Sequence, residues 1–155
     1  MDDFFPKDPA EDLLRGILLF NYEFPEFVLP EPERHERWLV RLIDAHKGQL
    51  DALSYVFCSD EQLLLINREH LDHDTYTDII TFPYREPPVL EGDIFISVER
   101  VGENARKFRV PFVEELRRVM AHGVLHLLGF GDKTDAEAAE MRQREQEALR
   151  MFDEL

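Results

Sequence analysis

The sequence predicts a single α+β domain, in which a small mixed sheet of about four strands packs with about five helices. Segments rich in aliphatic and aromatic residues, typical of strands, mix with segments of helical period, and the two kinds do not alternate strictly. A length of 155 residues, of which 44% are hydrophobic, suits one globular domain with an adequate core. We therefore treat residues 1–155 as one unit, in which residues 1–15 are expected to be partly mobile.

In the first half of the chain we expect two strands and two helices. The strands are predicted at residues 16–23 and 53–58, where aliphatic and aromatic residues predominate. Apolar and aromatic side chains recur at helical spacing over residues 35–46, and Gly48 is expected to mark the end of that helix. A capping box over residues 59–62 then opens a short helix that runs to about Arg68.

The second half is expected to add two strands and three helices. Strands are predicted at residues 79–82 and 94–98, linked by a loop that contains two prolines. Helical spacing of apolar residues from Val98 to Phe108 predicts the next helix, and Pro111 suits the first turn of the one that follows. A second capping box, Thr134 with Glu137, opens a charged C-terminal helix to about Phe152.

Composition limits the compartment and the partners. No apolar run reaches the roughly 18 residues of a membrane helix, and the acidic N-terminus lacks the basic start of a signal peptide. Cys58 is the only cysteine, which excludes an internal disulfide, suits a reducing cytosol and is interpreted as a small core residue on a strand. We therefore expect a cytoplasmic protein without membrane contact.

A pair of histidines carries the strongest chemical signal in the sequence. His122 and His126 lie four residues apart in an apolar run, so both rings face one side of a helix. Gly129 tolerates the left-handed conformation that ends many helices, and the returning chain can bring Asp132 towards the rings. Two imidazoles and a carboxylate, with one position open, are typical ligands of catalytic zinc. The alternative, two packed or surface histidines, is weakened by the positions of Gly129 and Asp132.

Proteases of the zincin class also place two histidines on one helix, in the pattern His-Glu-x-x-His. Their glutamate acts as the general base. The corresponding residue here is Gly123, which cannot carry a proton, so the pattern disfavours a metalloprotease and favours metal-assisted hydrolysis of another ester.

The same residues resemble the signature of the YbeY family, metal-dependent endoribonucleases of bacterial ribosomal RNA maturation. The family pattern His-Gly-x-Leu-His-Leu-x-Gly-Tyr-Asp-His is matched closely over residues 122–129, and the third histidine of the family is Asp132 here. Residues 77–83 and 92–97 are similar to the family segments Thr-Asp-Val-Leu-Ser-Phe-Pro and Gly-Asp-Ile-x-Ile-Ser. The resemblance covers the chain from about residue 50 to the end, and it extends more loosely into the first third.

The resemblance implies a single-strand-specific endoribonuclease that acts in 16S rRNA 3′-end maturation and in ribosome quality control. It implies one divalent metal, zinc, on His122, His126 and Asp132, with ribosomal RNA and the small ribosomal subunit as partners. Two alternatives stay open: a non-catalytic ribosome-assembly factor with a structural metal, and another metal-dependent hydrolase. Structural zinc sites have four protein ligands, mostly cysteine, so three candidates favour catalysis.

The RNA contacts are expected from basic residues that precede the histidine motif. The net charge of −15 is unusual for a protein that binds RNA, but six basic residues gather between Arg100 and Arg118. We expect RNA binding from Arg106, Lys107, Arg109 and Arg118. An arginine of the family is replaced by Leu71, and Arg118, four residues before His122, is the expected substitute for its phosphate contact. The alternative for Arg118 is an ion pair with Glu114 or Glu115.

Overall fold

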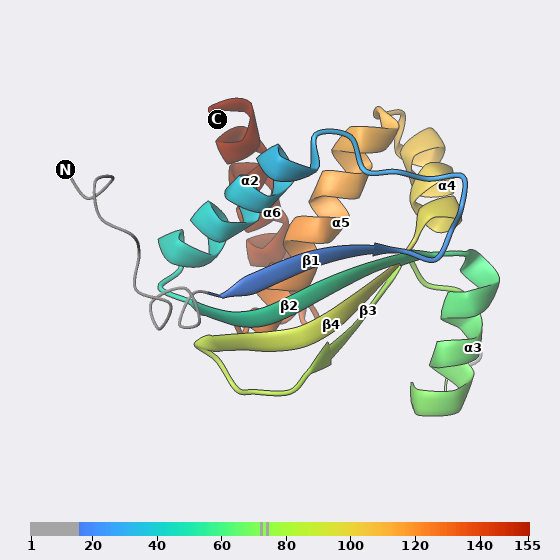
Figure 1. Ribbon diagram of the computed structural model, residues 1–155, viewed down its shortest axis with the longest axis horizontal. Helices are drawn as coiled ribbons and strands as arrows, with labels where there is room; N and C mark the ends of the chain where they lie inside the picture. The colour runs from blue at the N-terminus through green and yellow to red at the C-terminus, as the bar shows by residue number, and fades with distance from the viewer. Residues whose placement is uncertain (1–15, 72, 74) are drawn as a thin grey trace, which may run out of the picture.

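A four-stranded sheet forms one layer of the computed structural model, and helices gather on one of its faces (Figure 1). The structure describes residues 16–71, 73 and 75–155, so the expected mobility of residues 1–15 concerns residues outside this range. The elements are β1 (Ile17–Tyr22), α2 (Pro32–Ala45), β2 (Gln49–Cys58), α3 (Asp60–Leu71), β3 (Ile79–Pro83), β4 (Val89–Ser97), α4 (Val98–Phe108), α5 (Phe112–Leu127) and α6 (Asp135–Asp153).

The sheet is mixed, with the strand order β1-β2-β4-β3. Strand β1 runs parallel to β2, and β2 runs parallel to β4, whereas β3 is antiparallel to β4. Four strands and five helices among the described residues confirm the predicted α+β class.

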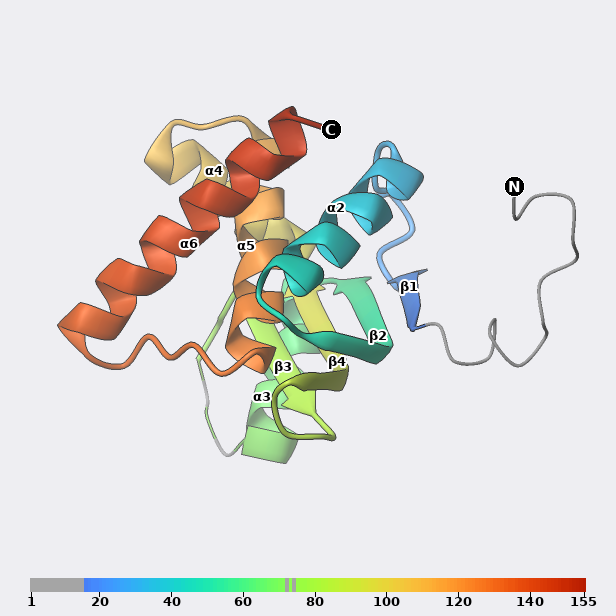
Figure 2. The ribbon, with the colours of Figure 1, turned by 90° about the vertical axis from the view of Figure 1, so that its left-hand side faces the viewer.

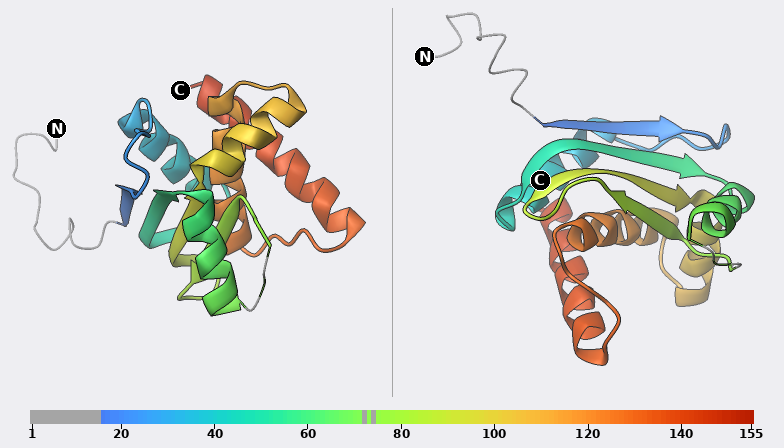
Figure 3. Two further views of the ribbon diagram at one scale, coloured as in Figure 1. Left: turned by 90° about the vertical axis from the view of Figure 1, so that its right-hand side faces the viewer. Right: turned by 90° about the horizontal axis from the view of Figure 1, so that it is seen from below.

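Helix α5 lies between the sheet and α6, as Figure 2 shows, and it is buried on most of its surface. The Tyr55 hydroxyl donates a 2.7 Å hydrogen bond to the Met120 carbonyl, and the Trp38 indole donates one of 2.7 Å to the Ala148 carbonyl. These buried bonds tie β2 to α5 and α2 to α6. Helix α3 stands apart at the end of the sheet (Figure 3), where Leu63 packs with Cys58 and Ile80 in a second small core.

The strand ends differ from the predicted ones in two places. Strand β2 begins at Gln49 and β4 at Val89, earlier than the expected residues 53 and 94. The two strands pair from Gln49 and Val89 onward, so backbone pairing carries β4 through Glu91, Gly92 and Asp93, residues that are depleted in strands.

Helix ends agree more closely with the predictions. Both capping boxes are present, with reciprocal hydrogen bonds between Ser59 and Gln62 and between Thr134 and Glu137. Helix α3 continues past Arg68 to Leu71, and Val98, expected to end a strand, begins α4 after the Ser97 cap. Helix α2 ends at Ala45, and the Gly48 amide donates a 2.9 Å hydrogen bond to the Ile43 carbonyl, so Gly48 lies at the helix end as expected, with Lys47 in the left-handed region. One local expectation was wrong: Pro111 is the N-cap of α5 rather than part of its first turn.

Cys58 lies on β2 and is buried, as expected, and burial raises the pKa of its thiol to about 12. Across the part of the chain described, no helix is long and apolar enough to span a bilayer.

Gly123 sets the distance between α5 and the sheet. A Cβ atom on this residue would lie 3.0 Å from Ile94 Cδ1 and 3.1 Å from Ile79 Cδ1, closer than most real contacts. Position 123 therefore faces the sheet, and α5 packs this closely because the residue has no side chain.

We predict that Gly123→Val destabilises the protein by about 1–3 kcal/mol, because the added methyl groups overpack the contact with Ile94 and Ile79. The matched control is Gly102→Ala in α4, where the nearest atom to a new Cβ is 3.8 Å away. That change should stabilise the protein by about 0.5–1 kcal/mol through helix propensity. Urea unfolding followed by circular dichroism measures both, and an unchanged midpoint for Gly123→Val would contradict the packing argument.

Candidate active site around His122

One face of α5 carries three functional side chains. Arg118, His122 and His126 follow one another at intervals of four residues. The helix ends at Leu127, and Gly129 adopts a φ of +106°, which lets the chain reverse direction. The returning loop brings Asp132 Oδ2 to 3.5 Å from His122 Nε2.

The two histidine rings are parallel, with centroids 6.5 Å apart and an interplanar angle of 4°. His122 is largely buried, whereas His126 is exposed. Within residues 16–71, 73 and 75–155, no three His, Cys, Asp or Glu side chains are close enough together to hold a metal ion as they stand. The structure therefore brings Asp132 against His122 without closing a three-ligand cluster that includes His126.

Glu145 on α6 fixes the orientation of His122. Its Oε2 atom accepts a 2.7 Å hydrogen bond from His122 Nδ1, and its side chain is only 4% exposed. Burial disfavours the charged imidazole, but the hydrogen bond to Glu145 and the charges of Glu145, Asp132 and Asp78 outweigh that effect and raise the pKa of His122. With Nδ1 engaged, Nε2 is the ring atom directed to Asp132.

The side chains of His122, His126 and Asp132 suit a divalent transition metal. Two imidazoles and a carboxylate are ordinary zinc ligands. A carboxylate that binds the second ring nitrogen, as Glu145 does on His122, is the usual support of a metal-bound histidine.

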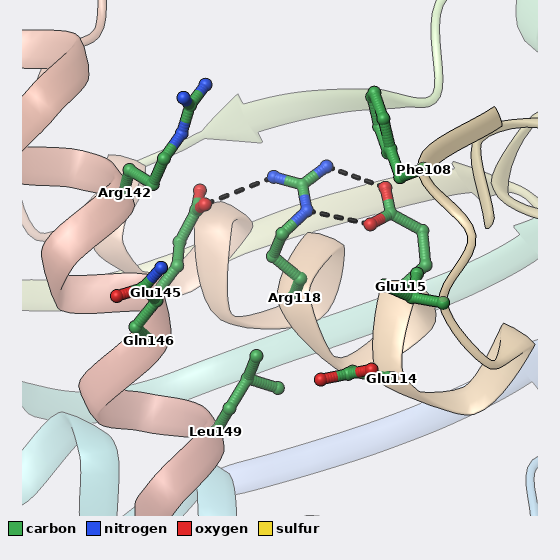
Figure 4. Close-up of a pocket in the computed structure, with 9 residues that line it drawn as sticks. Phe108, Glu114, Glu115, Arg118, Arg142, Glu145, Gln146 and Leu149 are labelled. Atoms are coloured by element: carbon green, nitrogen blue, oxygen red, sulfur yellow. Dashed lines mark hydrogen bonds and ion pairs between the residues drawn. The ribbon is translucent and has the colours of Figure 1, made fainter.

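Arg118 is the centre of a partly buried ion-pair network (Figure 4). Its Nε and Nη2 atoms donate to the two carboxylate oxygens of Glu115 at 2.9 and 2.7 Å, and Nη1 donates to Glu145 at 3.1 Å. Asp78 Oδ2 is 4.0 Å from Nη2. The hydrogen bonds to Glu115 are the main cause of the raised pKa of Arg118. The pairing with Glu115, given above as the alternative for Arg118, is therefore present.

A cavity of about 260 Å³ opens beside His122. Its walls come from three parts of the chain: Thr77, Asp78 and Ile79 before and within β3, Arg118, Val119 and His122 on α5, and Asp132 on the loop. Burial raises the pKa of Asp78, although Arg118 and His122 oppose the effect. An imidazole, a guanidinium and two carboxylates thus meet at one half-open site, a set of groups suited to hydrolysis of a charged ester.

A profile described as Endoribonuclease YbeY matches residues 28–153. The chain belongs to the endoribonuclease YbeY family. Endoribonuclease YbeY of Flavobacterium johnsoniae is 49% identical over 136 residues, which cover 88% of this chain and 97% of that protein. Endoribonuclease YbeY of Bacteroides fragilis is 40% identical over 136 residues, which cover 86% of this chain and 98% of that protein. The family's members are nucleases, hydrolases that act on RNA.

The solution structure of TM1509 from Thermotoga maritima has the same fold. The two structures match with a TM-score of 0.64 at 23% sequence identity, over 88% of this YbeY chain and 89% of the other.

The basic residues expected to bind RNA fall into two groups in this YbeY protein. Arg106, Lys107 and Arg109 are exposed at the end of α4, and we call them the α4 basic cluster. Arg118 instead lies in the ion-pair network and lines the His122 cavity. Leu71, the residue in place of the family arginine, ends α3 and is 41% exposed.

Sequence reasoning did not place two carboxylates of the site, Asp78 and Glu145, and it named Glu115 only as a partner of Arg118. One signal for Glu145 was available, because it lies in the buried stripe of α6 with Met141, Ala148 and Phe152. A glutamate in an apolar stripe needs a buried partner.

We predict that Arg118→Leu destabilises the protein by about 3–5 kcal/mol, because it leaves the buried carboxylates of Glu115 and Glu145 without their cation. The matched control is Arg85→Leu, since Arg85 forms ion pairs with Asp51 and Glu91 at 3.8 and 3.6 Å but is 54% exposed. Arg85→Leu should destabilise the protein by at most about 1 kcal/mol. Equal shifts of the urea midpoint in the two variants would contradict the role of the buried network.

Proposed function

We propose that this protein is a single-strand-specific, metal-dependent endoribonuclease that acts in 16S rRNA 3′-end maturation and ribosome quality control. Its substrate is ribosomal RNA of the small subunit, and its compartment is the cytoplasm. Family membership supports the nuclease activity. The observation that carries the site assignment is the orientation of His122, whose Nδ1 binds buried Glu145 while Nε2 faces Asp132 in the cavity.

His122, His126 and Asp132 would hold one zinc ion. The bound metal supplies Lewis-acid chemistry, either by lowering the pKa of a water molecule or by stabilising charge on the phosphate. Asp132 takes the place of the third histidine of the family, which adds one negative charge to the ligand set. Bringing His126 into the set requires a movement of side chains, which is open to His126 and Asp132 because both lie at the surface.

Two further groups act on the substrate. Asp78 lines the cavity and is the carboxylate placed to accept a proton from the attacking oxygen. Arg118 lines the same cavity and contacts the phosphate in place of the arginine that Leu71 replaces. Glu115 and Glu145 hold its guanidinium in position, so Arg118 needs no reorganisation when the substrate arrives.

The deciding experiment is cleavage of single-stranded RNA by highly purified protein, with and without added divalent metal. Metal-dependent cleavage that is lost in His122→Ala supports the proposed enzyme. Metal binding without cleavage by the parent protein would overturn it and favour an assembly factor with a structural metal.

We predict about one equivalent of zinc per chain in the parent protein and a large loss of metal in His122→Ala and His126→Ala. Asp132→Ala should also lose metal, because three ligands are the minimum of such sites. Elemental analysis of the purified variants measures this. Full metal content in Asp132→Ala would remove Asp132 from the ligand set.

We predict that Asp78→Asn lowers kcat by about 100-fold or more, the usual contribution of a positioned proton acceptor. Metal content and RNA affinity should stay near those of the parent, since the amide keeps the shape of the carboxylate. Single-turnover cleavage assays measure the effect. A kcat within threefold of the parent, on the order of 0.7 kcal/mol, would exclude Asp78 as the proton acceptor.

We predict that RNA affinity falls with added salt, and that Arg106→Glu combined with Arg109→Glu flattens this dependence. Each phosphate contact on a single strand contributes about 0.7 to the slope of log K against log salt. The control is Arg37→Glu with Arg41→Glu on exposed positions of α2, which changes the net charge equally. Equal effects of the two pairs would show a general charge effect rather than a contact at the α4 basic cluster.

A further inference from the structure

A second cavity, of about 400 Å³, lies on α5 and α6 beside the end of α4 (Figure 4). Its volume is in the range of small-ligand sites. It is lined by Phe108, Val110, Glu114, Glu115, Arg118, Arg142, Glu145, Gln146 and Leu149. None of the roles described so far uses its apolar walls.

An exposed aromatic ring stands at the entrance of this cavity. Phe108 is the last residue of α4 and is 53% exposed, although a ring of this size normally finds a partner. The Nζ atom of Lys107 lies 5.9 Å from the ring centroid, within reach of a cation–π contact. Val110 and Leu149 supply further apolar surface.

Two of the carboxylates that line the cavity are paired. Glu115 binds Arg118 through both carboxylate oxygens, and Glu145 binds both Arg118 and His122. The third, Glu114, is exposed. Exposed Arg142 on α6 and Lys107, whose Nζ lies near the Phe108 ring, add positive charge.

This cavity and the His122 cavity share a wall. Arg118 lines both of them, and Glu145, which lines the larger cavity, holds His122 of the smaller one. A single strand whose phosphate occupies the His122 cavity can therefore reach the larger cavity past one shared side chain, Arg118.

We propose that the larger cavity binds one unstacked base of the single-stranded RNA, with Phe108 as its stacking platform. The inference rests on the proposed function, because the phosphate next to that base lies in the His122 cavity. Every base has a π face, so an aromatic ring beside a basic rim binds single strands with little sequence preference. Exposed Gln146 and Glu114 offer hydrogen-bonding groups to the edge of the base. A duplex keeps its bases stacked and paired, so the pocket selects single strands.

The test measures binding of a short single-stranded oligoribonucleotide with 2′-O-methyl riboses, which resists cleavage, to the full chain with its metal as purified. Phe108→Ala should weaken binding by about fivefold to 150-fold, the range for loss of one stacked base. Phe108→Trp should retain the affinity, because it retains the stacking surface. A 2-aminopurine base in the oligonucleotide should lose fluorescence on the parent protein and keep it on Phe108→Ala.

The matched control is Tyr84→Ala. Tyr84 is a second exposed aromatic residue, with 58% of its surface exposed, and it lines neither cavity. The Tyr84→Ala variant should bind the oligonucleotide as tightly as the parent does. An abasic nucleotide should weaken binding to the parent at one position and have no further effect on Phe108→Ala.

If the parent and Phe108→Ala bind the oligonucleotide equally and both cleave RNA, the base pocket is overturned and the proposed function stands. The cavity would then be left for a protein side chain. Failure of the parent itself to bind or cleave single-stranded RNA would overturn both the pocket and the proposed function.

Discussion

The hydrogen bonds of one buried carboxylate hold the site together. Glu145 lies on α6, yet it binds Arg118 and His122, which are one turn apart on α5. A carboxylate that is 4% exposed is costly unless both oxygens have charged or polar donors, and here each oxygen has one. The packing of α6 on α5 and the orientation of His122 therefore depend on the same side chain. Any change that separates the two helices also releases the imidazole.

Helix α5 serves the core and the site with different faces. Gly123 lets the helix approach Ile94 and Ile79, while the adjacent His122 points to the cavity. The absence of a side chain at position 123 has a chemical consequence as well as a packing one. Gly123 cannot supply a general base between the helix and the sheet, and the proton acceptor proposed above, Asp78, instead precedes β3 in the wall of the cavity.

Electrostatics limit where RNA can approach. A net charge of −15 repels phosphates over most of the surface. Arg142 lines the larger cavity, Lys107 of the α4 basic cluster lies near its Phe108 ring, and Arg118 lines both cavities. A protein with an excess of acidic residues gains specificity by placing its cations beside apolar and aromatic surface, since base stacking does not depend on net charge.

The sequence by itself determined the local features of this protein. Helical spacing placed His122 and His126 on one face, Gly129 reversed the chain towards Asp132, and both capping boxes formed, because each feature depends on residues within about one turn of helix or loop. Only the tertiary structure decided the starts of β2 and β4, which depend on pairing between strands far apart in the sequence. Only the tertiary structure brought together Asp78, Arg118 and Glu145, which come from three parts of the chain separated by up to 67 residues. The pair of Arg118 with Glu115 is local, three residues apart on α5, and the sequence offered it. The partners on other elements are chosen by the packing of helices and strands rather than by spacing along the chain.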